Sequence, residues 1–510
     1  MLRRLLRGAG ANGVGTLADI LARLLLVPLY LKVWSVGTYG EWLALQSLVY
    51  YLANLDFGMS RAAVNAATMA YARGDWDEFK RVQGTAWAFA LTVTCIATVL
   101  IVIPSMVFPV ERWLGLREIG ALEARTVAGC FAFSLVVTLA GKQLASVYVA
   151  IGEFATYQWL YNASSIASSI VTALMLFLGA RPMVVGGVLV GITLAYVSAC
   201  GLLLRRRDRR LFPRIAFADR ATARRLAAPT FYFFLTLVAT TLALQGPVVL
   251  ISRVLGGSAV ALFVTARTLA NVPRQVSGLW RYPLQPELCA MAATNSDARL
   301  SRVFRMMLSV ESLMGVSFLA IVWACGPQLM RVWTAGGIVA PPAFLRTIAT
   351  ASVLEGFLLA MVCISVVTNR LGRVVLAQLV VAVGCLLAAA PFLATSGLSA
   401  LPTASLLLLA TILLPVAVRE VHISTHMNTR AVLLQIVCPF AAMLGLSAAT
   451  AQWITGHLVG RPWTAGACAG SAGFAMSLLV LAATFDAEDR RRLGFSILSR
   501  LRSRQEARVA

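Results

Sequence analysis

Three arginines recur at intervals of seven residues within one largely apolar stretch of the chain, ALFVTARTLANVPRQVSGLWRYPLQPEL at 261–288. They are Arg267, Arg274 and Arg281. A spacing of seven rotates each residue only about 20° from the last on an α-helix, so the side chains form one stripe, which Asn271 shares. With a rise of about 1.5 Å per residue, successive guanidinium groups lie roughly 10 Å apart. Because a planar guanidinium binds phosphate through two parallel hydrogen bonds, the stripe predicts a ladder for a phosphorylated anion.

The position of these arginines predicts what the stripe faces. Arg267 and Arg274 lie near the middle of a stretch long enough to span a membrane, where an arginine costs about +2.5 to +3.5 kcal/mol. Each neighbouring apolar residue returns only about −0.3 to −0.6 kcal/mol. We therefore expect the two arginines to face a water-filled cavity or bound counter-charges. The alternative is that acids on neighbouring helices neutralise them or that they snorkel to the interface, and Arg281 fits that alternative equally well.

A second group of polar residues lies in other apolar stretches. Arg23 joins the substrate-binding candidates, although Asp19 stands four residues before it and could pair with it instead. Asp19, Asp56 and Glu355 are candidates for coupling transport to a cation, and Asp56 and Glu355 are expected near the ends of spans. Pro273, beside Arg274, could expose backbone carbonyls at mid-membrane or simply kink the helix for packing.

The sequence predicts neither a catalytic constellation nor a metal site. The nine cysteines are scattered and contain no C-x-x-C pair, so we interpret them as small buried hydrophobes. His422 and His426 are four residues apart, but no third ligand lies near them. The phosphate-binding, serine-hydrolase and zinc-protease motifs are absent. We expect a protein without enzymatic activity, cofactor or metal.

The composition requires a membrane environment. The chain has 510 residues, of which 59% are hydrophobic and 13% charged, with a mean hydropathy of +0.81. That share of charge is about half that of a soluble domain. Apolar stretches predict an all-α polytopic membrane protein with about 14 transmembrane helices. The expected spans are 11–33, 39–58, 83–106, 125–148, 156–178, 183–204, 227–251, 258–281, 304–326, 343–367, 372–393, 401–418, 431–450 and 464–484.

The basic residues predict the orientation of the chain. There are 44 Lys and Arg against 21 Asp and Glu. With a cytoplasmic N-terminus, about 31 basic residues fall in or beside inner segments and about 8 in outer ones, as the positive-inside rule requires. Both termini are then cytoplasmic. The richest cluster, RRRDRR at 205–210, is more typical of an anchor against anionic lipids than of a nucleic-acid site, so we expect no nucleic-acid partner.

The same basic cluster divides the chain. We expect two six-helix halves around a central cavity, with a binding site at their interface, followed by two additional helices. The predicted units are an N-terminal half at 1–204, a basic cytoplasmic linker at 205–226, a C-terminal half at 227–418, two further helices at 419–484 and a basic cytoplasmic tail at 485–510.

The first 80 residues resemble the opening of a known family. The stretch NGVGTLADILARLLLVPLYLKVW leads into a short turn at Tyr39–Gly40, and the next span closes on Leu55, Asp56, Phe57 and Gly58 before a loop of small residues. Over 11–75 this pattern resembles the oligosaccharide (polysaccharide repeat-unit) flippases of the multidrug/oligosaccharidyl-lipid/polysaccharide exporter superfamily. Elsewhere the likeness is one of architecture only, and no functional residue is carried over from it.

The resemblance and the arginine stripe together imply a flippase. Its substrate would be a polyprenyl-diphosphate-linked oligosaccharide, moved by alternating access to the outer leaflet of a bacterial inner membrane for O-antigen, capsule or exopolysaccharide synthesis. Membrane lipids are expected partners, as are a polysaccharide polymerase and export proteins. One alternative is a cation-coupled multidrug antiporter, which would prefer an acidic cavity. Another is a membrane glycan polymerase or ligase, although the outer loops are short for such an enzyme.

Overall fold

A computed structural model describes residues 2–105, 107–278, 297–368, 370, 372–458 and 461–484, together with Arg281, Leu284 and Leu288. These residues form helices and short connections, without a strand among them. The predicted tail at 485–510 lies outside the described residues. The prediction of an all-α protein is confirmed.

The first half of the chain contains six long helices and several short ones. The long helices are α1 (Leu2–Val33), α2 (Val36–Tyr50), α4 (Trp76–Ala97), α7 (Ala121–Ala150), α8 (Phe154–Phe177) and α9 (Pro182–Arg207). Helix α2 continues as the 3-10 helix η1 (Tyr51–Asp56), and α4 as a π-helical turn, η2 (Thr98–Val102). The short helices are α3 (Met59–Ala72), α5 (Ile103–Ser105), α6 (Val110–Leu114) and η3 (Ile215–Phe217).

The second half begins with the 36-residue helix α10 (Arg220–Leu255). It continues with α11 (Gly257–Ala270), helical residues 272–278, α13 (Asp297–Trp333), α14 (Pro342–Val367), α15 (Gly372–Ala389), η4 (Ala390–Phe392), α16 (Leu393–Ser396), η5 (Gly397–Ser399), α17 (Ala400–Leu408), the π-helical turn η6 (Leu409–Leu413) and α18 (Leu414–Thr425). The last elements are α19 (Thr429–Val432), the π-helical turn η7 (Leu433–Val437), α20 (Cys438–His457) and α21 (Pro462–Thr484).

Within the described residues, 11 helical stretches are long and apolar enough to cross a membrane. One of them, Gly372–Thr425, has 54 residues and folds back on itself, because α15 packs against α17. The apolar helices α2 and α11, with 15 and 14 residues, are shorter than the others but also follow the predicted spans. Every one of the expected spans therefore has a helical counterpart, and the architecture of about 14 transmembrane helices is confirmed.

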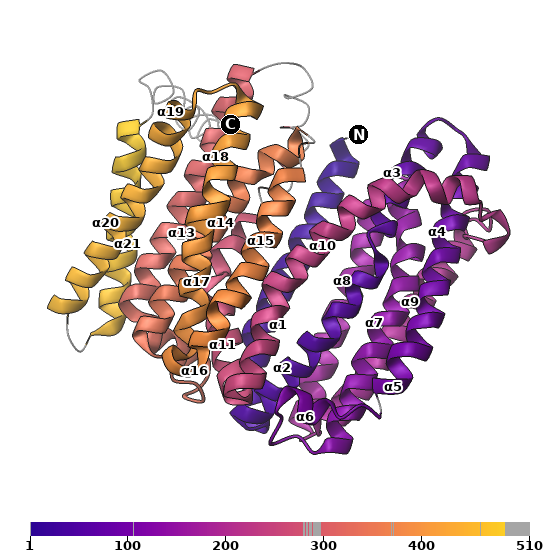
Figure 1. Ribbon diagram of the computed structural model, residues 1–510, viewed down its shortest axis with the longest axis horizontal. Helices are drawn as coiled ribbons and strands as arrows, with labels where there is room; N and C mark the ends of the chain where they lie inside the picture. The colour runs from indigo at the N-terminus through magenta and orange to yellow at the C-terminus, as the bar shows by residue number, and fades with distance from the viewer. Residues whose placement is uncertain are drawn as a thin grey trace, which may run out of the picture.

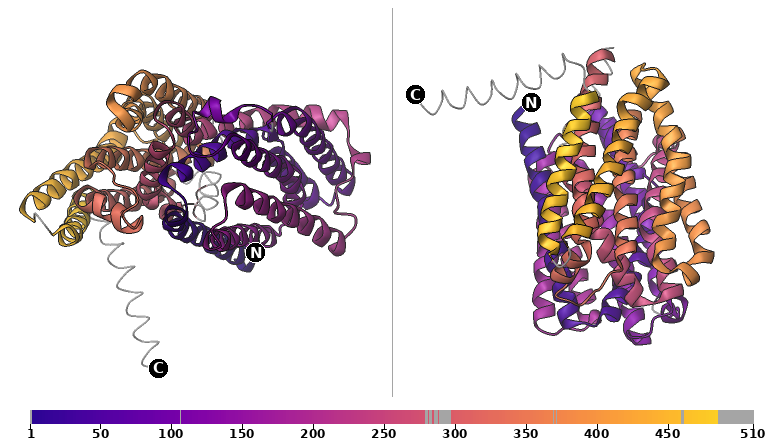
Figure 2. Two further views of the ribbon diagram at one scale, coloured as in Figure 1. Left: turned by 90° about the horizontal axis from the view of Figure 1, so that it is seen from below. Right: turned by 90° about the vertical axis from the view of Figure 1, so that its left-hand side faces the viewer.

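The helices gather into two groups that lie side by side (Figure 1). Helices α1 to α9 form one group and α11 to α18 the other, while α10 runs obliquely between them. Helices α20 and α21 pack against α13 at the far edge of the second group, away from the first (Figure 2). The predicted boundaries of the two halves remain predictions, although 208–219 is the part of the expected linker that lies between helices.

Basic segments gather at one end of the molecule. The N-terminus, the α3–α4 turn, the α9–α10 connection and α19 all lie at the upper end in Figure 1. Local capping begins the helices there: Asp75 Oδ1 accepts from Glu78 N at 2.9 Å, and Asp219 Oδ2 from Thr222 N at 2.8 Å. We call this the basic end. The opposite end carries α6 and α16.

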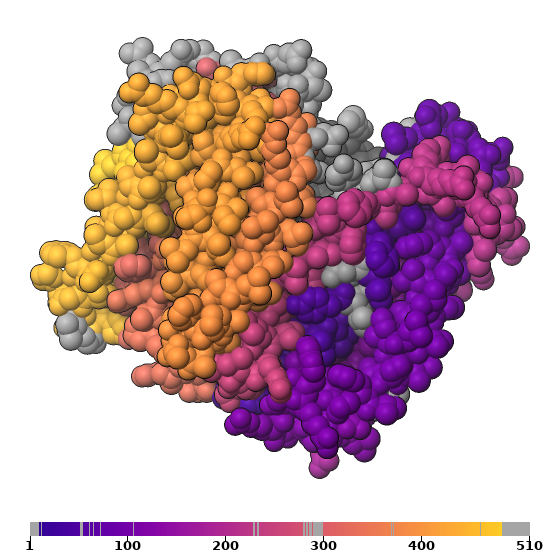
Figure 3. Space-filling view, viewed as in Figure 1, coloured from indigo at the N-terminus to yellow at the C-terminus, as the bar shows by residue number. Residues whose placement is uncertain are grey.

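The two groups of helices meet at the opposite end, which we call the closed end (Figure 3). The contact is closest where α11 starts against α2, because a Cβ added to Gly40 would lie 1.7 Å from the carbonyl oxygen of Gly257. Only glycine permits backbones to approach this closely. A second tie joins α13 to α1: Trp333 Nε1 donates to Leu24 O at 2.7 Å. That carbonyl lacks its usual helical donor because Pro28, four residues on, has no N–H.

Two acid groups, one of them buried, reinforce the closed end. Glu41 on α2 is only 2% exposed, and its carboxylate accepts hydrogen bonds from the backbone N–H groups of Arg117, Glu118 and Ile119 at 2.5 to 3.1 Å. Glu118 in turn accepts from Thr38 N at 3.1 Å, at the start of α2. The side chain of Glu41 therefore holds the 117–119 segment against α2.

Candidate functional site

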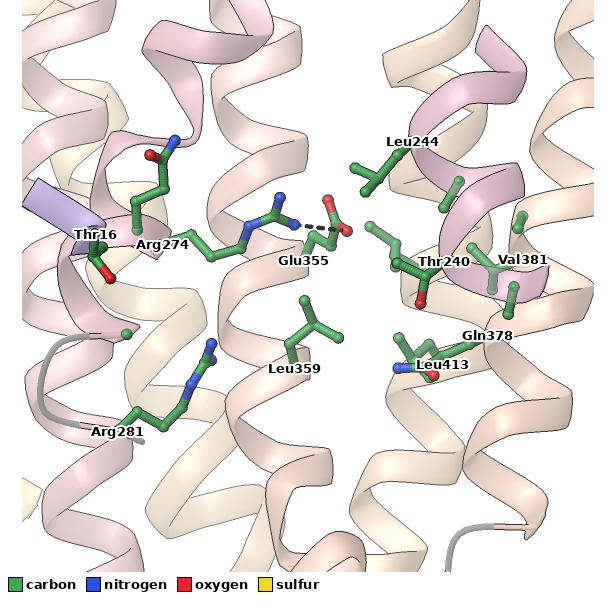
Figure 4. Close-up of a pocket in the computed structure, with 16 residues that line it drawn as sticks. Thr16, Thr240, Leu244, Arg274, Arg281, Glu355, Leu359, Gln378, Val381 and Leu413 are labelled. Atoms are coloured by element: carbon green, nitrogen blue, oxygen red, sulfur yellow. Dashed lines mark ion pairs between the residues drawn. The ribbon is translucent and has the colours of Figure 1, made fainter. Parts of the chain in front are cut away.

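A cavity of about 480 Å³ lies between the two groups of helices (Figure 4). Its walls come from α1, α10, α14, α15, η6 and the segment that follows α11. Most of its lining is aliphatic, with Leu244, Leu359 and Leu413 among the side chains. The polar lining is drawn from both groups but mainly from the second: Thr16, Thr240, Arg274, Gln275, Arg281, Glu355 and Gln378.

A smaller cavity of about 90 Å³ adjoins the first, with which it shares Arg274 and Glu355. Arg267 and Asn271 line it. All four members of the predicted stripe therefore border one continuous polar region. Counting about 1.5 Å per helical residue from Gly257, Arg267 and Arg274 lie about 15 and 26 Å from the closed end.

Arg274 forms an ion pair inside this region. Its Nη1 atom lies 2.9 Å from Glu355 Oε1, and the two side chains are 21% and 35% exposed (Figure 4). Glu355 sits in the middle of α14, so the expectation that it lies near the end of a span is wrong. Arg274 is therefore neutralised by an acid on a neighbouring helix, which is one of the alternatives that the sequence left open. Both side chains still line the cavity.

Arg267 is held differently. Its Nη1 atom donates to Leu244 O on α10 at 2.6 Å, and its guanidinium carbon lies 5.3 Å from the centre of the Phe263 ring. Neither partner carries a negative charge, so the positive charge of Arg267 is uncompensated by these contacts. A carbonyl and an aromatic face fix the fork in position while leaving most of its five N–H donors for a ligand.

The helix that carries the stripe is distorted at Asn271. Helix α11 ends at Ala270, Asn271 has φ −87° and ψ −1°, and helical geometry resumes at 272–278. The predicted span of 258–281 is thus distorted two residues before Pro273 but not broken, because Asn271 N donates to Arg267 O at 3.0 Å and Gln275 N to Asn271 O at 3.1 Å. Pro273 has no N–H to donate to Leu269 O. Asn271 is 9% exposed, and its Oδ1 atom has no hydrogen-bond partner within the described part of the chain.

Sequence reasoning missed one buried acid beside the stripe. Glu311 on α13 is 6% exposed and accepts a hydrogen bond from Ser277 Oγ at 2.7 Å. Glu311 lies close to α14 at Gly356, the residue directly after Glu355. A Cβ added to Gly356 would lie 3.7 Å from Glu311 Oε1. The signal was present, because Glu311 is the one acid within the predicted span 304–326.

Three other candidates lie away from the cavity lining. Arg23 is exposed on α1 and borders neither cavity. Asp19 accepts from Ser165 Oγ on α8 at 2.6 Å, and the structure shows no ion pair between Asp19 and Arg23. Asp56 ends η1 and accepts from Ser60 Oγ at 2.6 Å. The structure therefore assembles the second-half candidates and leaves those of the first half in separate local contacts.

Metal chemistry has no support in the described residues. No group of three or more His, Cys, Asp and Glu side chains is placed to hold an ion there. The eight cysteines within the described ranges are free thiols. The site offers guanidinium, carboxylate and amide groups for binding.

The described helices thus form two groups, and a cavity lined by aliphatic and charged side chains lies between α1, α10 and the second group. Comparison of the sequence with protein-family models and with curated proteins finds no match. Comparison with solved structures finds a similar fold in transporters of the MOP superfamily. An inward-facing multidrug resistance MATE family transporter of this superfamily aligns with a TM-score of 0.66 and 12% identity, over 82% of this chain and 99% of the other.

Two further structures sharpen the comparison. The lipid II flippase MurJ in an inward closed conformation aligns with a TM-score of 0.65 and 13% identity, over 92% of this chain and 97% of the other. An outward-facing MATE family transporter gives 0.56 and 12% identity, over 83% and 96%. These neighbours are transporters and a flippase, and the inward-facing MATE transporter aligns with a higher TM-score than the outward-facing one.

Proposed function

We propose that this chain is a flippase for a polyprenyl-diphosphate-linked oligosaccharide, moving it from the cytoplasmic to the outer leaflet for surface polysaccharide synthesis. The observation that carries the proposal is the row Arg267, Asn271 and Arg274 along a cavity between two groups of helices. A diphosphate headgroup needs a wet, cationic route through the bilayer, since a charge in hydrocarbon is costly. The broader likeness to a lipid II flippase, over 92% of this chain, supports a lipid-linked substrate.

The charge of the site favours an anion. Arg267, Arg274 and Arg281 border the cavities, while Glu355 is the acid in their lining and Glu311 lies buried behind it. The region therefore carries more positive than negative charge. A cation would be repelled by the two arginines near mid-membrane, whereas a diphosphate would gain charge-assisted bidentate contacts from each.

In the proposed mechanism Arg274 exchanges its ion pair with Glu355 for contacts with the diphosphate. Without substrate, Glu355 neutralises its guanidinium and so reduces the cost of holding a cation inside the bilayer. A diphosphate entering the cavity competes for the same fork, while Arg267 and the unpartnered Asn271 Oδ1 are already in place to contact the phosphates and a sugar hydroxyl. Arg281 and Arg23 would act at the approaches to this site.

Alternating access would follow from rocking of the two helix groups. The closed end seals one side by the Gly40–Gly257 contact, so the cavity would load from the basic end. The positive-inside rule supports a cytoplasmic basic end with both termini inside, and we propose a bacterial inner membrane as the location. Polysaccharide polymerase and export proteins would receive the product at the outer face.

The main alternative is a cation-coupled multidrug antiporter. The likeness to MATE transporters favours it, as does the presence of Glu355 and Glu311 near the cavity. Asp19 and Asp56 would then join Glu355 as coupling groups. The excess of arginine opposes it, because a cationic drug would meet like charge. A membrane glycan polymerase or ligase receives no support from a fold shared with transporters.

Reconstituted liposomes test the proposal directly. The purified chain is inserted into vesicles that contain a fluorescent polyprenyl-diphosphate oligosaccharide, and exposure of the sugar on the far leaflet is measured with an impermeant glycosidase. Arg267→Ala together with Arg274→Ala should abolish translocation, and lysine at both positions should restore it in part, because lysine lacks the fork. Arg346→Ala is the matched control: Arg346 lies on α14 but packs against Trp323, outside the cavity.

In cells, loss of the protein should cause complete lipid-linked repeat units to accumulate on the inner leaflet. Units that reach the outer face without being polymerised would instead indicate a polymerase. Full translocation by the double alanine variant would refute the assigned role of the arginines, and extrusion of cationic dyes by the same vesicles would favour the antiporter.

A further inference from the structure

Three arginines converge on a separate pocket at the closed end. The pocket has a volume of about 280 Å³ and lies between α6, the segment that follows it and the end of α10. Arg112 comes from α6, Arg117 from the following segment and Arg253 from the last turn of α10. This end of the molecule has few basic residues, about 8 by the sequence count, so a convergence of three there is unexpected from the positive-inside rule.

Contacts within the protein already fix the shape of this pocket. Ser252 Oγ donates to Leu114 O at 3.0 Å, and Arg253 Nη1 donates to Arg112 O at 2.9 Å. Gly115, in the left-handed region at φ 70°, lets the chain turn beside α10, where an added Cβ would lie 3.7 Å from two carbonyl oxygens. The hydrogen bond to Arg112 O uses one of the five N–H donors of Arg253. It holds the Arg253 side chain in position before a ligand binds.

Nearby acids do not neutralise the three arginines. Glu111 also lines the pocket, but both of its oxygens are bound by Arg125, at 2.6 and 3.1 Å. The hydrogen bonds from Arg125, with a smaller attraction from Arg112, hold the pKa of Glu111 below its ordinary value, and Arg125 binds both of its oxygens. Glu41 and Glu118 are committed to backbone N–H groups, as described above.

No ion pair to Arg112, Arg117 or Arg253 is formed by the residues that the structure describes. All three side chains are exposed, so an approaching anion can reach them. Arginine forks prefer phosphate and carboxylate oxygens. The volume lies just below that of a pocket for a drug-sized ligand, which suits a compact headgroup rather than an oligosaccharide.

We propose that Arg112, Arg117 and Arg253 form a binding site for a lipid-borne phosphate group at the closed end of the molecule. The group is either the phosphodiester of a phospholipid in the adjoining leaflet or the diphosphate of a translocated lipid. The phospholipid source is independent of what the central cavity carries, whereas the diphosphate source rests on the proposed function. A phosphate there would bridge α6 to the end of α10, directly before Gly256, whose φ of 85° and ψ of −179° suit glycine alone.

Lipid binding to the full-length protein tests this site. The purified chain in phosphatidylcholine nanodiscs is titrated with phosphatidylglycerol and, separately, with pyrophosphate, and bound ligand is counted by native mass spectrometry. The variant R112Q/R117Q/R253Q should weaken the tightest binding about tenfold or more. The matched control R181Q/R331Q/R461Q removes three exposed arginines that lie outside this pocket and should bind like the wild type.

Hydrogen exchange near the pocket distinguishes ligand bound there from ligand bound at the basic end. Hydrogen exchange of residues 110–119 should slow when ligand is added to the wild type and not when it is added to R112Q/R117Q, a variant that keeps the Arg253 contact to the α6 backbone. Displacement of phosphatidylglycerol by pyrophosphate identifies the diphosphate source, and retention identifies the phospholipid. Equal weakening in the test and control variants, or no protection of 110–119 in the wild type, overturns the proposal.

Discussion

Substitution of Gly40 by alanine should open the closed end. The added Cβ would lie 1.7 Å from Gly257 O, whereas an ordinary contact begins at 3.4 Å, so α2 and α11 must separate by about 1.7 Å. The obstacle is a backbone carbonyl, which cannot rotate away as a side chain could. Overpacking of this kind costs about 1 to 3 kcal/mol. If that cost falls only on the conformation closed at this end, the population shifts toward opening by about 5- to 150-fold.

Pulsed electron–electron resonance measures the shift. Spin labels at Arg181 and Val339, both exposed in connections at the closed end, report the distance between the two helix groups in a cysteine-free background. G40A should add a longer-distance population. Gly187→Ala is the control, because an added Cβ there meets nothing within 4 Å. A distance distribution in G40A equal to that of G187A would refute the reasoning that this glycine contact closes the molecule.

Three further substitutions have defined outcomes. Glu355→Gln should release Arg274 and tighten binding of a polyprenyl diphosphate roughly fivefold while slowing its turnover, measured by titration and vesicle translocation against Glu153→Gln as control. Trp333→Phe removes a hydrogen bond to Leu24 O worth about 1 kcal/mol and should shift the spin-label distances in the same direction as G40A, unlike the exposed Trp453→Phe. Glu111→Gln should remove one component of acid sensitivity. Since Arg125 lowers the pKa of Glu111, its contribution to stability is present above the ordinary value of 4.5 and lost as the pH falls through the lower folded value. Thermal unfolding of wild type and variant should therefore converge in acid, and a constant difference down to pH 2 would contradict this assignment.

Helix number and the position of spans could be predicted from the sequence because both depend on local apolar length. The stripe of Arg267 and Arg274 could be predicted as well, since a seven-residue spacing fixes one helix face whatever the neighbours. The partner of Arg274 could not. Glu355 is 81 positions further along the chain, and only the packing of α14 beside α11 and its continuation brings the two together.

The same limit explains the failures. Glu355 was expected near the end of a span, but it lies in the middle of α14. Asp19 and Arg23 satisfy a helical pairing rule, yet Ser165 on another helix provides a hydrogen bond to Asp19 instead. Tertiary partners decide which charged residues face a cavity, and hydropathy carries no information about them.

The ion pair between Arg274 and Glu355 also sets the electrical behaviour of the proposed cycle. In the empty protein the two charges cancel, so the membrane potential does almost no work on this part of the site as the helix groups rearrange. A bound diphosphate adds net negative charge, and each elementary charge that crosses the full membrane is worth about 2.3 kcal/mol per 100 mV. An inside-negative potential would therefore favour outward movement of the bound diphosphate, and the neutral Arg274–Glu355 pair would not oppose the empty return step.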